Sequence, residues 1–170
     1  DLLSTGVGGS AEVEIGSTLV RLAAESVLAL LRVDDRQLVL RLREGSLIIR
    51  CRSVEMARQT TIDCAGLRFE PCDAGRYGLQ LVAEGVTGTA WEGTLRCSAA
   101  GRSHLIAAGQ SIRLGSDGEA ESQARAMDRD ELARWNPAGE TEPGAGDEFR
   151  HVSSELTGAA DLAAHGDWYE

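Results

Sequence analysis

The sequence contains no lysine, so its 17 strongly basic residues are all arginine, and 27 aspartates and glutamates outnumber them. The formal net charge of −10 disfavours nucleic acid and anionic lipid as partners, because phosphate binding needs a basic stripe on the protein. A GC-rich genome, which favours arginine codons, is the simpler explanation of the missing lysine. A surface selected for bidentate pairing of arginine with carboxylates is the alternative.

Long apolar runs are also missing. The longest spans residues 27–31, far short of the roughly 20 residues of a membrane helix, so we expect no transmembrane segment in this chain. No signal peptide is recognisable. The chain begins at Asp1 rather than Met, and both ends fall inside a pattern, so we expect the natural protein to be longer.

Catalytic and cofactor motifs are absent as well. There is no nucleophile elbow, HExxH, Walker loop or GxGxxG, and the glycine-rich stretch 6–10 precedes a predicted strand rather than a helix. His104, His151 and His165 are widely spaced, and no carboxylate pair lies among apolar residues where its pKa would shift. We therefore predict a protein that is not an enzyme and has no cofactor and no metal site.

The four cysteines, Cys51, Cys64, Cys72 and Cys97, lack the spacing of a zinc module. Three of them continue inward apolar stripes, which favours buried free thiols. One or two disulfides are the alternative, with the pairing left open. A tight turn at residues 65–66 would place Cys72 far along the hairpin from Cys64, which argues against a bond between these two.

Apolar and polar residues alternate from Ala11 to Leu114, which predicts strands with one buried face. The predicted strands cover residues 10–15, 18–23, 26–33, 36–44, 46–52, 59–64, 67–72, 76–83, 87–91, 94–98, 102–107 and 110–114. Short glycine-containing links exclude helical crossovers. We predict an all-β fold, either a β-sandwich or roll or a solenoid-like stack of about twelve short strands, followed by one short helix and an extended tail.

The inward positions of these strands predict a core built almost entirely from aliphatic side chains. Its members are Val13, Ile15, Leu19, Leu28, Leu30, Leu38, Leu40, Leu42, Leu47, Ile49, Ile62, Phe69, Tyr77, Leu79, Leu81, Leu95, Leu105 and Ile112. His104, which alternates with Leu105, is expected to point outward. Residues 53–59 fit either a short helical turn or a loop.

The character of the chain changes after Gly115, which predicts three parts: a β domain over 1–115, a linker with a short helix over 116–136, and a flexible spacer with a docking tail over 137–170. The helix would begin at Asp128. The tail is too sparse in apolar residues to fold alone, so its large side chains need a surface to cover them. The candidate partner-binding residues are Trp135, Phe149, Leu156, Trp168 and Tyr169.

Several stretches resemble the FecR-type domain of bacterial envelope proteins. The resemblance covers residues 1 to about 115, with its motifs at residues 5–30, 42–50, 68–77, 91–95 and 107–114. A branch of that family shares the patterns of residues 130–135 and 152–169. It implies an extracytoplasmic, periplasmic location and a signal-relay role. The cytoplasmic helical domain and membrane helix of the best-understood members are absent from this sequence, which puts the role of sigma regulator in doubt.

Two functions follow as expectations. The first is a non-catalytic, extracytoplasmic protein-binding module that engages another envelope or membrane-complex protein, with a possible place in signal relay. The alternative is a structural or assembly subunit of a larger membrane-associated complex or homo-oligomer, held by the tail. The tail folding back over the chain's own sheet is a further alternative. A carbohydrate-binding domain is disfavoured, because the strands lack aromatic platforms.

Overall fold

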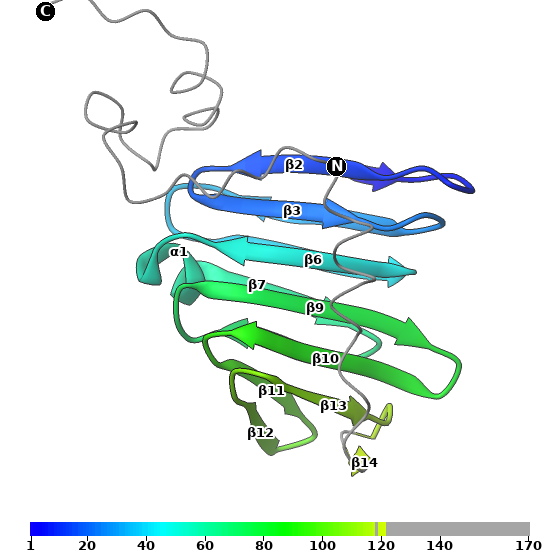
Figure 1. The fold of residues 1–170 in the computed structure, drawn as a ribbon, viewed down its shortest axis with the longest axis vertical. Helices are drawn as coiled ribbons and strands as arrows, with labels where there is room; N and C mark the ends of the chain where they lie inside the picture. Colours follow the sequence, from blue (N-terminus) through cyan, green and yellow to red (C-terminus); the bar gives the residue numbers. More distant parts are fainter. Residues whose placement is uncertain (118, 122–170) are drawn as a thin grey trace, which may run out of the picture.

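The chain alternates between two sheets that pack face to face (Figure 1). The structure is a computed structural model that describes residues 1–117 and 119–121. In spatial order, sheet A contains β1 (Leu2–Ser4), β4 (Val27–Val33), β5 (Leu38–Glu44), β7 (Thr60–Cys64), β8 (Leu67–Pro71), β11 (Leu95–Ala99) and β12 (Arg102–Ile106). Sheet B contains β14 (Ala120–Glu121), β13 (Gln110–Leu114), β10 (Gly85–Glu92), β9 (Gly75–Val82), β6 (Ser46–Cys51), β3 (Thr18–Leu22) and β2 (Ala11–Ile15).

Consecutive strands form antiparallel hairpins that are placed in the two sheets in turn. The hairpins β4–β5, β7–β8 and β11–β12 lie in sheet A, and β2–β3, β9–β10 and β13–β14 lie in sheet B. The parallel pair is β5 with β7, which are separated in sequence by β6 in sheet B and the helix α1 (Val54–Gln59). This two-sheet architecture confirms the all-β prediction.

The core lies between the sheets and is mostly aliphatic, because each strand turns alternate residues inward. Phe69 from sheet A and Tyr77 from sheet B are its largest fully buried side chains. The Tyr77 hydroxyl donates a 2.7 Å hydrogen bond to the Asp73 carbonyl, so burial of the ring leaves no unpaired hydroxyl. Burial is also the main cause that raises the pKa of Tyr77 to about 12.

A single residue, Gly45, links β5 in sheet A to β6 in sheet B. Its φ of +75° lies in the left-handed region, and a Cβ there would lie 2.7 Å from the Glu25 carbonyl oxygen. Ser26 fixes the same corner, since its hydroxyl accepts a 3.0 Å hydrogen bond from the Ser46 amide. Only glycine combines this backbone conformation with so close an approach.

The helix α1 is capped at both ends by hydroxyl side chains. Ser53 accepts a 3.2 Å hydrogen bond from the Met56 amide at the N-terminus, and Thr60 donates a 2.7 Å bond to the Met56 carbonyl at the C-terminus. Ala57 is fully buried. Of the two alternatives for residues 53–59, the structure therefore has the helical turn. It is too short to cross a bilayer, and none of the helices in the described part is long and apolar enough to do so.

The predicted strand positions are confirmed: each of the twelve forms with ends within two residues of the prediction. β1 and β14 were not predicted, because strands of three and two residues are too short to show alternation. The short helix predicted within 116–136 and the tail over 137–170 lie outside the described residues, and the three-part division of the chain stays a prediction.

Two residues of the predicted core face away from it. The prediction for Leu105 is wrong, since its side chain is 60 % exposed, while Ile106 is fully buried. The pairing of β11 with β12 sets His104 opposite Cys97 and Ile106 opposite Leu95, so His104 and Ile106 share the inward face, and the outward expectation for His104 is wrong too. Leu19 is buried, but it lies outside the core cluster that contains Val20 and Leu22, its neighbours on β3.

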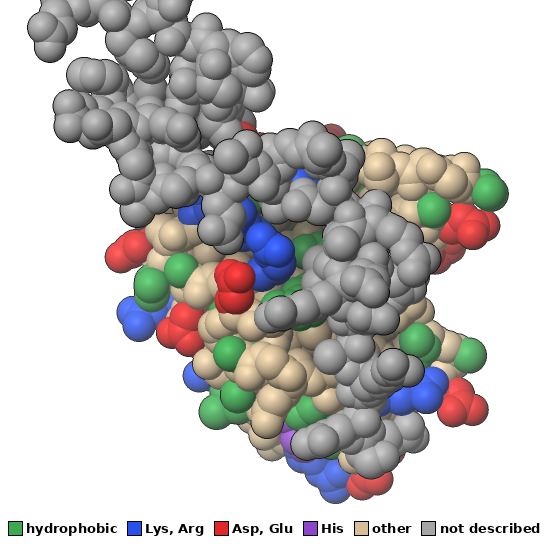
Figure 2. Space-filling view, in the orientation of Figure 1, with side chains coloured by type: hydrophobic (Ala, Val, Ile, Leu, Met, Phe, Trp, Pro, Cys, Tyr) green, Lys and Arg blue, Asp and Glu red, His purple; other side chains and the backbone are tan. Residues whose placement is uncertain are grey.

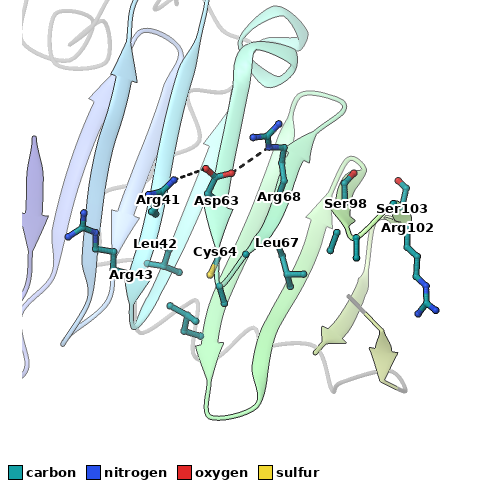
Figure 3. A pocket seen from close by; sticks show the side chains of 16 residues that line it. Arg41, Leu42, Arg43, Asp63, Cys64, Leu67, Arg68, Ser98, Arg102 and Ser103 are labelled. Atoms are coloured by element: carbon teal, nitrogen blue, oxygen red, sulfur yellow. Dashed lines mark hydrogen bonds and ion pairs between the residues drawn. The ribbon is translucent and has the colours of Figure 1, made fainter. Parts of the chain in front are cut away.

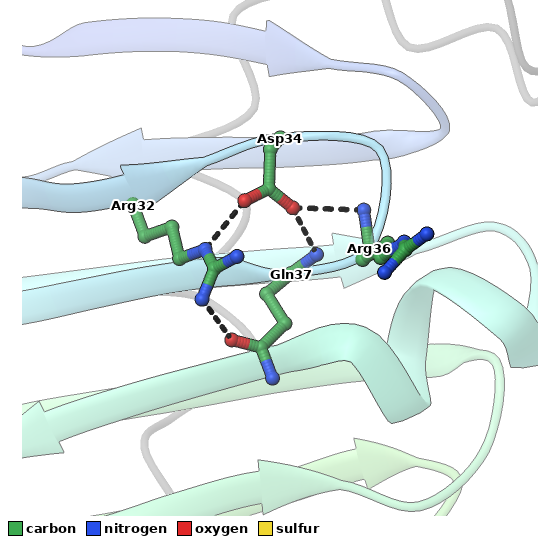
Figure 4. Close-up of polar contacts among 4 residues, drawn as sticks. All are labelled: Arg32, Asp34, Arg36 and Gln37. Carbon is green, nitrogen blue, oxygen red and sulfur yellow. Dashed lines mark hydrogen bonds and ion pairs between the residues drawn. The ribbon is translucent and has the colours of Figure 1, made fainter.

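A carboxylate organises the turn between β4 and β5 (Figure 4). Asp34 accepts 2.9 Å hydrogen bonds from the backbone amides of Arg36 and Gln37 and a further one from the Arg32 side chain. Arg32 also donates a 3.1 Å bond to the Gln37 side chain. The bond from Arg32 is the largest of the causes that hold the pKa of Asp34 below its usual range.

The phase of β12 can be tested with adjacent residues. Ile106→Ala removes a fully buried side chain, so we expect it to lower the free energy of unfolding by about 2–5 kcal/mol. Leu105→Ala is the matched control, and it should change that free energy by no more than about 0.5 kcal/mol. Denaturant unfolding of both variants measures the difference, and a larger loss for Leu105→Ala would reverse the assigned phase.

The hydrogen bonds of the β4–β5 turn predict a lowered pKa for Asp34, which a titration can measure. In an NMR titration the Asp34 carboxyl should show a pKa below that of an ordinary aspartate, and Arg32→Ala should raise it. The depressed pKa means that the turn's contribution to stability is present at neutral pH and is lost as pH falls through the folded-state pKa of Asp34. An unchanged Asp34 pKa in Arg32→Ala would remove Arg32 as the cause.

Candidate functional site

A hollow of about 1020 Å³ opens at one end of sheet A, where the β7–β8 and β11–β12 turns meet the second half of β5 (Figure 3). We call it the arginine hollow. Its lining residues are Arg41, Leu42, Arg43, Asp63, Cys64, Ala65, Gly66, Leu67, Arg68, Leu81, Ser98, Ala99, Ala100, Gly101, Arg102 and Ser103. Four arginines stand there against one carboxylate, so the lining is positive in a chain whose net charge is −10.

Strand register brings three of the charged side chains into one row. Arg41 on β5 pairs with Asp63 on β7, and Asp63 pairs with Arg68 on β8. The Asp63 carboxylate lies between the two guanidinium groups, 3.4 Å from Arg41 Nη2 and 3.5 Å from Arg68 Nε. Since the Asp63 side chain is only 23 % exposed while both arginines are half exposed, the guanidinium groups keep donors available to a further acceptor.

The other two arginines differ in their pairing. Arg102 on β12 donates a 2.8 Å hydrogen bond from Nη1 to the Glu119 carboxylate, which raises the pKa of Arg102. Arg43, at the end of β5, is exposed and has no ion pair within the described residues. Arg43 is therefore the arginine of the hollow that a bound carboxylate would engage without first displacing an internal partner.

The thiol in the hollow is not activated. Cys64 is buried on the inward face of β7, and burial, with a smaller contribution from Cys97, raises its pKa to about 12. Burial raises the pKa of Cys97 to about 11 as well. Both thiols are therefore protonated at neutral pH, whereas a nucleophilic cysteine needs a lowered pKa. No set of three or more His, Cys, Asp or Glu residues in the described ranges is arranged to hold a metal ion.

The arginine hollow is thus suited to binding carboxylates. Planar guanidinium groups donate pairs of hydrogen bonds to a carboxylate, and several such groups at one edge of a sheet fit an acidic segment of a protein better than a single small ion. The chemistry offered by these residues is recognition rather than bond making or breaking.

The cysteines predicted as disulfide candidates are all free thiols in the structure. Cys51, Cys64 and Cys97 are buried, in agreement with their inward stripes, and Cys72 is half-buried near the end of β8. The disulfide alternative stays a prediction for direct measurement. The five predicted partner-binding residues, Trp135, Phe149, Leu156, Trp168 and Tyr169, lie outside the described residues.

The arginine hollow was not predicted from the sequence. Arg41, Arg43 and Arg68 occupy outward positions of β5 and β8, where an arginine alternating with core residues is typical of any solvated strand face. Arg102 is exposed at the start of β12, in phase with His104 and Ile106. Only the parallel pairing of β5 with β7 places Arg41 beside Asp63 and Arg68. A local sequence pattern contains no signal for that pairing.

The fold is similar to two crystal structures of a "putative anti-sigma factor" from Parabacteroides distasonis ATCC 8503. Each has a TM-score of 0.63 and 13% sequence identity over 79% of this chain. The match spans 63% of the length of one and 64% of the other, so this chain corresponds to less than two thirds of each. At this identity the likeness shows a shared fold.

No family model matches the sequence, and no curated protein matches it. The predicted FecR-type resemblance is therefore wrong as an assignment of family, since its short motifs are not matched by any model and the structural similarity is to the Parabacteroides protein. The extracytoplasmic location rested largely on that resemblance. It is tested by none of these findings and stays a prediction.

The burial of the cysteines predicts their reactivity. With Ellman's reagent at pH 8, Cys72 should react in the folded protein, while Cys51, Cys64 and Cys97 should react only after unfolding, because burial protects them and raises their pKa to about 11, about 12 and about 11. Cys72→Ser should abolish the reaction of the native protein. Fewer than four thiols in the unreduced, unfolded protein would instead establish a disulfide.

Proposed function

We propose that this chain is a non-catalytic protein-binding module with a regulatory role, and that it takes an acidic segment of its partner in the arginine hollow. The observation that carries the proposal is the lining of the hollow at the end of sheet A, which contains four arginines and one carboxylate in a chain that is acidic as a whole. Two of the arginines pair with Asp63, one pairs with Glu119, and Arg43 has no ion pair within the described residues. Such a local reversal of charge attracts acidic ligands to one place on the surface.

The structural comparison supports the regulatory part. The name of the Parabacteroides protein describes a regulator that acts on another protein, and the shared two-sheet fold makes the same general role a reasonable proposal for this chain. The chemistry of the hollow supports the non-catalytic part. Its cysteine has a raised pKa, and its one carboxylate lies between two arginines.

The alternative function, a structural or assembly subunit held by the C-terminal tail, depends on residues outside the described ranges. It stays a prediction. The arginine hollow favours the binding module, because it lies in sheet A, within the described part of the chain, and offers a site for a partner that does not involve the C-terminal tail.

A pair of charge reversals tests the proposal. Arg43→Glu should weaken binding of a fluorescent oligoglutamate peptide by about two- to tenfold, the size expected for an exposed charge contact. Arg36→Glu is the matched control: it makes the same change in net charge at an exposed turn outside the hollow and should have little effect. Fluorescence anisotropy at low and physiological salt measures both, and salt should weaken the wild-type interaction.

The same variants test the function with the natural partner. Immobilised wild-type protein should retain a defined set of proteins from the cells that make it, Arg36→Glu should retain the same set, and Arg43→Glu should lose it. Equal retention by both variants would exclude the hollow as the binding site. Retention of no protein by the wild type would contradict the binding module itself.

A further inference from the structure

The outer face of sheet B combines apolar side chains with arginines and glutamates. Among these, Arg21 is paired with Glu12 and Arg52 with Glu14. One row of register partners across its strands contains Glu14 on β2, Leu19 on β3, Arg50 on β6, Arg76 on β9 and Glu92 on β10, next to Trp91 at the bulge in that strand. The neighbouring row contains Ile48 on β6 opposite Gly78 on β9. We call these residues the sheet B outer face.

The Trp91 indole lies over Gly78 on this face. A Cβ added at Gly78 would lie 2.4 Å from the indole ring, so the glycine leaves the space that the ring occupies. The indole Nε1 is buried and has no hydrogen-bond partner among the residues that the structure describes. A buried indole N–H normally finds an acceptor, so this group points to a ligand that supplies a carbonyl or carboxylate oxygen.

The face has the character of a docking surface. Leu19, Ile48 and Trp91 belong to no part of the core cluster between the sheets. In the described part of the chain no strand or helix crosses in front of sheet B, as the view of Figure 1 shows. Apolar side chains gathered on one side of a sheet and flanked by arginines are suited to an acidic segment that carries large apolar residues.

The sequence of this chain contains such a segment. Residues 122–170 hold eleven carboxylates and only four arginines, together with Trp135, Phe149, Trp168 and Tyr169. They follow β14, which pairs with β13 at the edge of sheet B. Five strand spacings of about 4.8 Å separate β14 from β3, roughly 24 Å in all, which a few extended residues can span.

We propose that residues 122–170 dock on the sheet B outer face of the same chain. The aromatic residues of the segment cover Leu19, Ile48 and Trp91, and its carboxylates lie near Arg50. The surface is independent of the arginine hollow, so either proposal can fail without the other.

Site-specific photo-crosslinking of the full chain tests the docking. A benzophenone amino acid replaces Gln80, an exposed residue on β9 that lies two positions from Gly78 on the same face. Illumination of dilute protein should join position 80 to a peptide from 122–170. The matched control places the same group at Leu105, an exposed position on the outer face of sheet A, which should give little of this product.

Mixing light and heavy-isotope protein separates a link within one chain from a link between two copies. Only light–light and heavy–heavy products are expected. Mixed products would show docking on a second copy, and links from Leu105 in place of Gln80 would show docking on sheet A. Either result, or no link from Gln80, would overturn the proposal.

The charge contact has its own control in the same experiment. Arg50→Glu should lower the yield of the link from Gln80 severalfold, whereas Arg43→Glu, the same change on sheet A, should leave it unchanged. Circular dichroism of both variants confirms that each is folded. Equal yields in the two variants would remove Arg50 from the docking surface.

Discussion

The fold depends on one constraint: each strand can bury the side chains of only one of its two faces in the core between the sheets. Within the described residues, Phe69 and Tyr77 are the only aromatic members of that core, so close packing relies on aliphatic side chains and on glycine where they meet. A Cβ at Gly88 would lie 3.0 Å from both Phe69 and Ile106, so glycine lets side chains of sheet A reach the backbone of sheet B. Charged side chains that could bind a partner therefore lie outside this core.

Arginine supplies all the strongly basic side chains of the outward faces, because the chain contains no lysine. In a chain with net charge −10, a positive site needs several arginines close together, and strand register brings Arg41 and Arg68 together. At the arginine hollow, Asp63 partly neutralises Arg41 and Arg68 and orients them. Arg43 stands outside this arrangement. The contrast between oriented and unpaired arginines within one hollow favours binding of an extended acidic segment, which can engage several donors in turn.

The sequence predicted the strands well and the site poorly, for physical reasons. Alternation is a local property, so twelve strands and most of the core followed from it. The prediction that Leu105 is buried was wrong, because the pairing with β11, and not the apolarity of one residue, decides which side of β12 faces inward. The arginine hollow requires the parallel pairing of β5 with β7 across an intervening strand and helix, a long-range contact that leaves no mark on spacing.

Charge alone does not decide which arginine-bearing face receives residues 122–170, because the segment is acidic enough for either. Reach does not decide it either, since the segment is long compared with the width of both sheets. The apolar side chains of the two faces decide which one receives the segment. In the arginine hollow, Leu42 and Leu67 are almost fully buried in the core and offer little to a ligand. On the sheet B outer face, Leu19 and Ile48 are 7 % exposed and Trp91 is half-buried, but all three lie on the side of the sheet away from that core, where aromatic residues of the segment can pack against them. Docking there leaves the arginine hollow open to a partner.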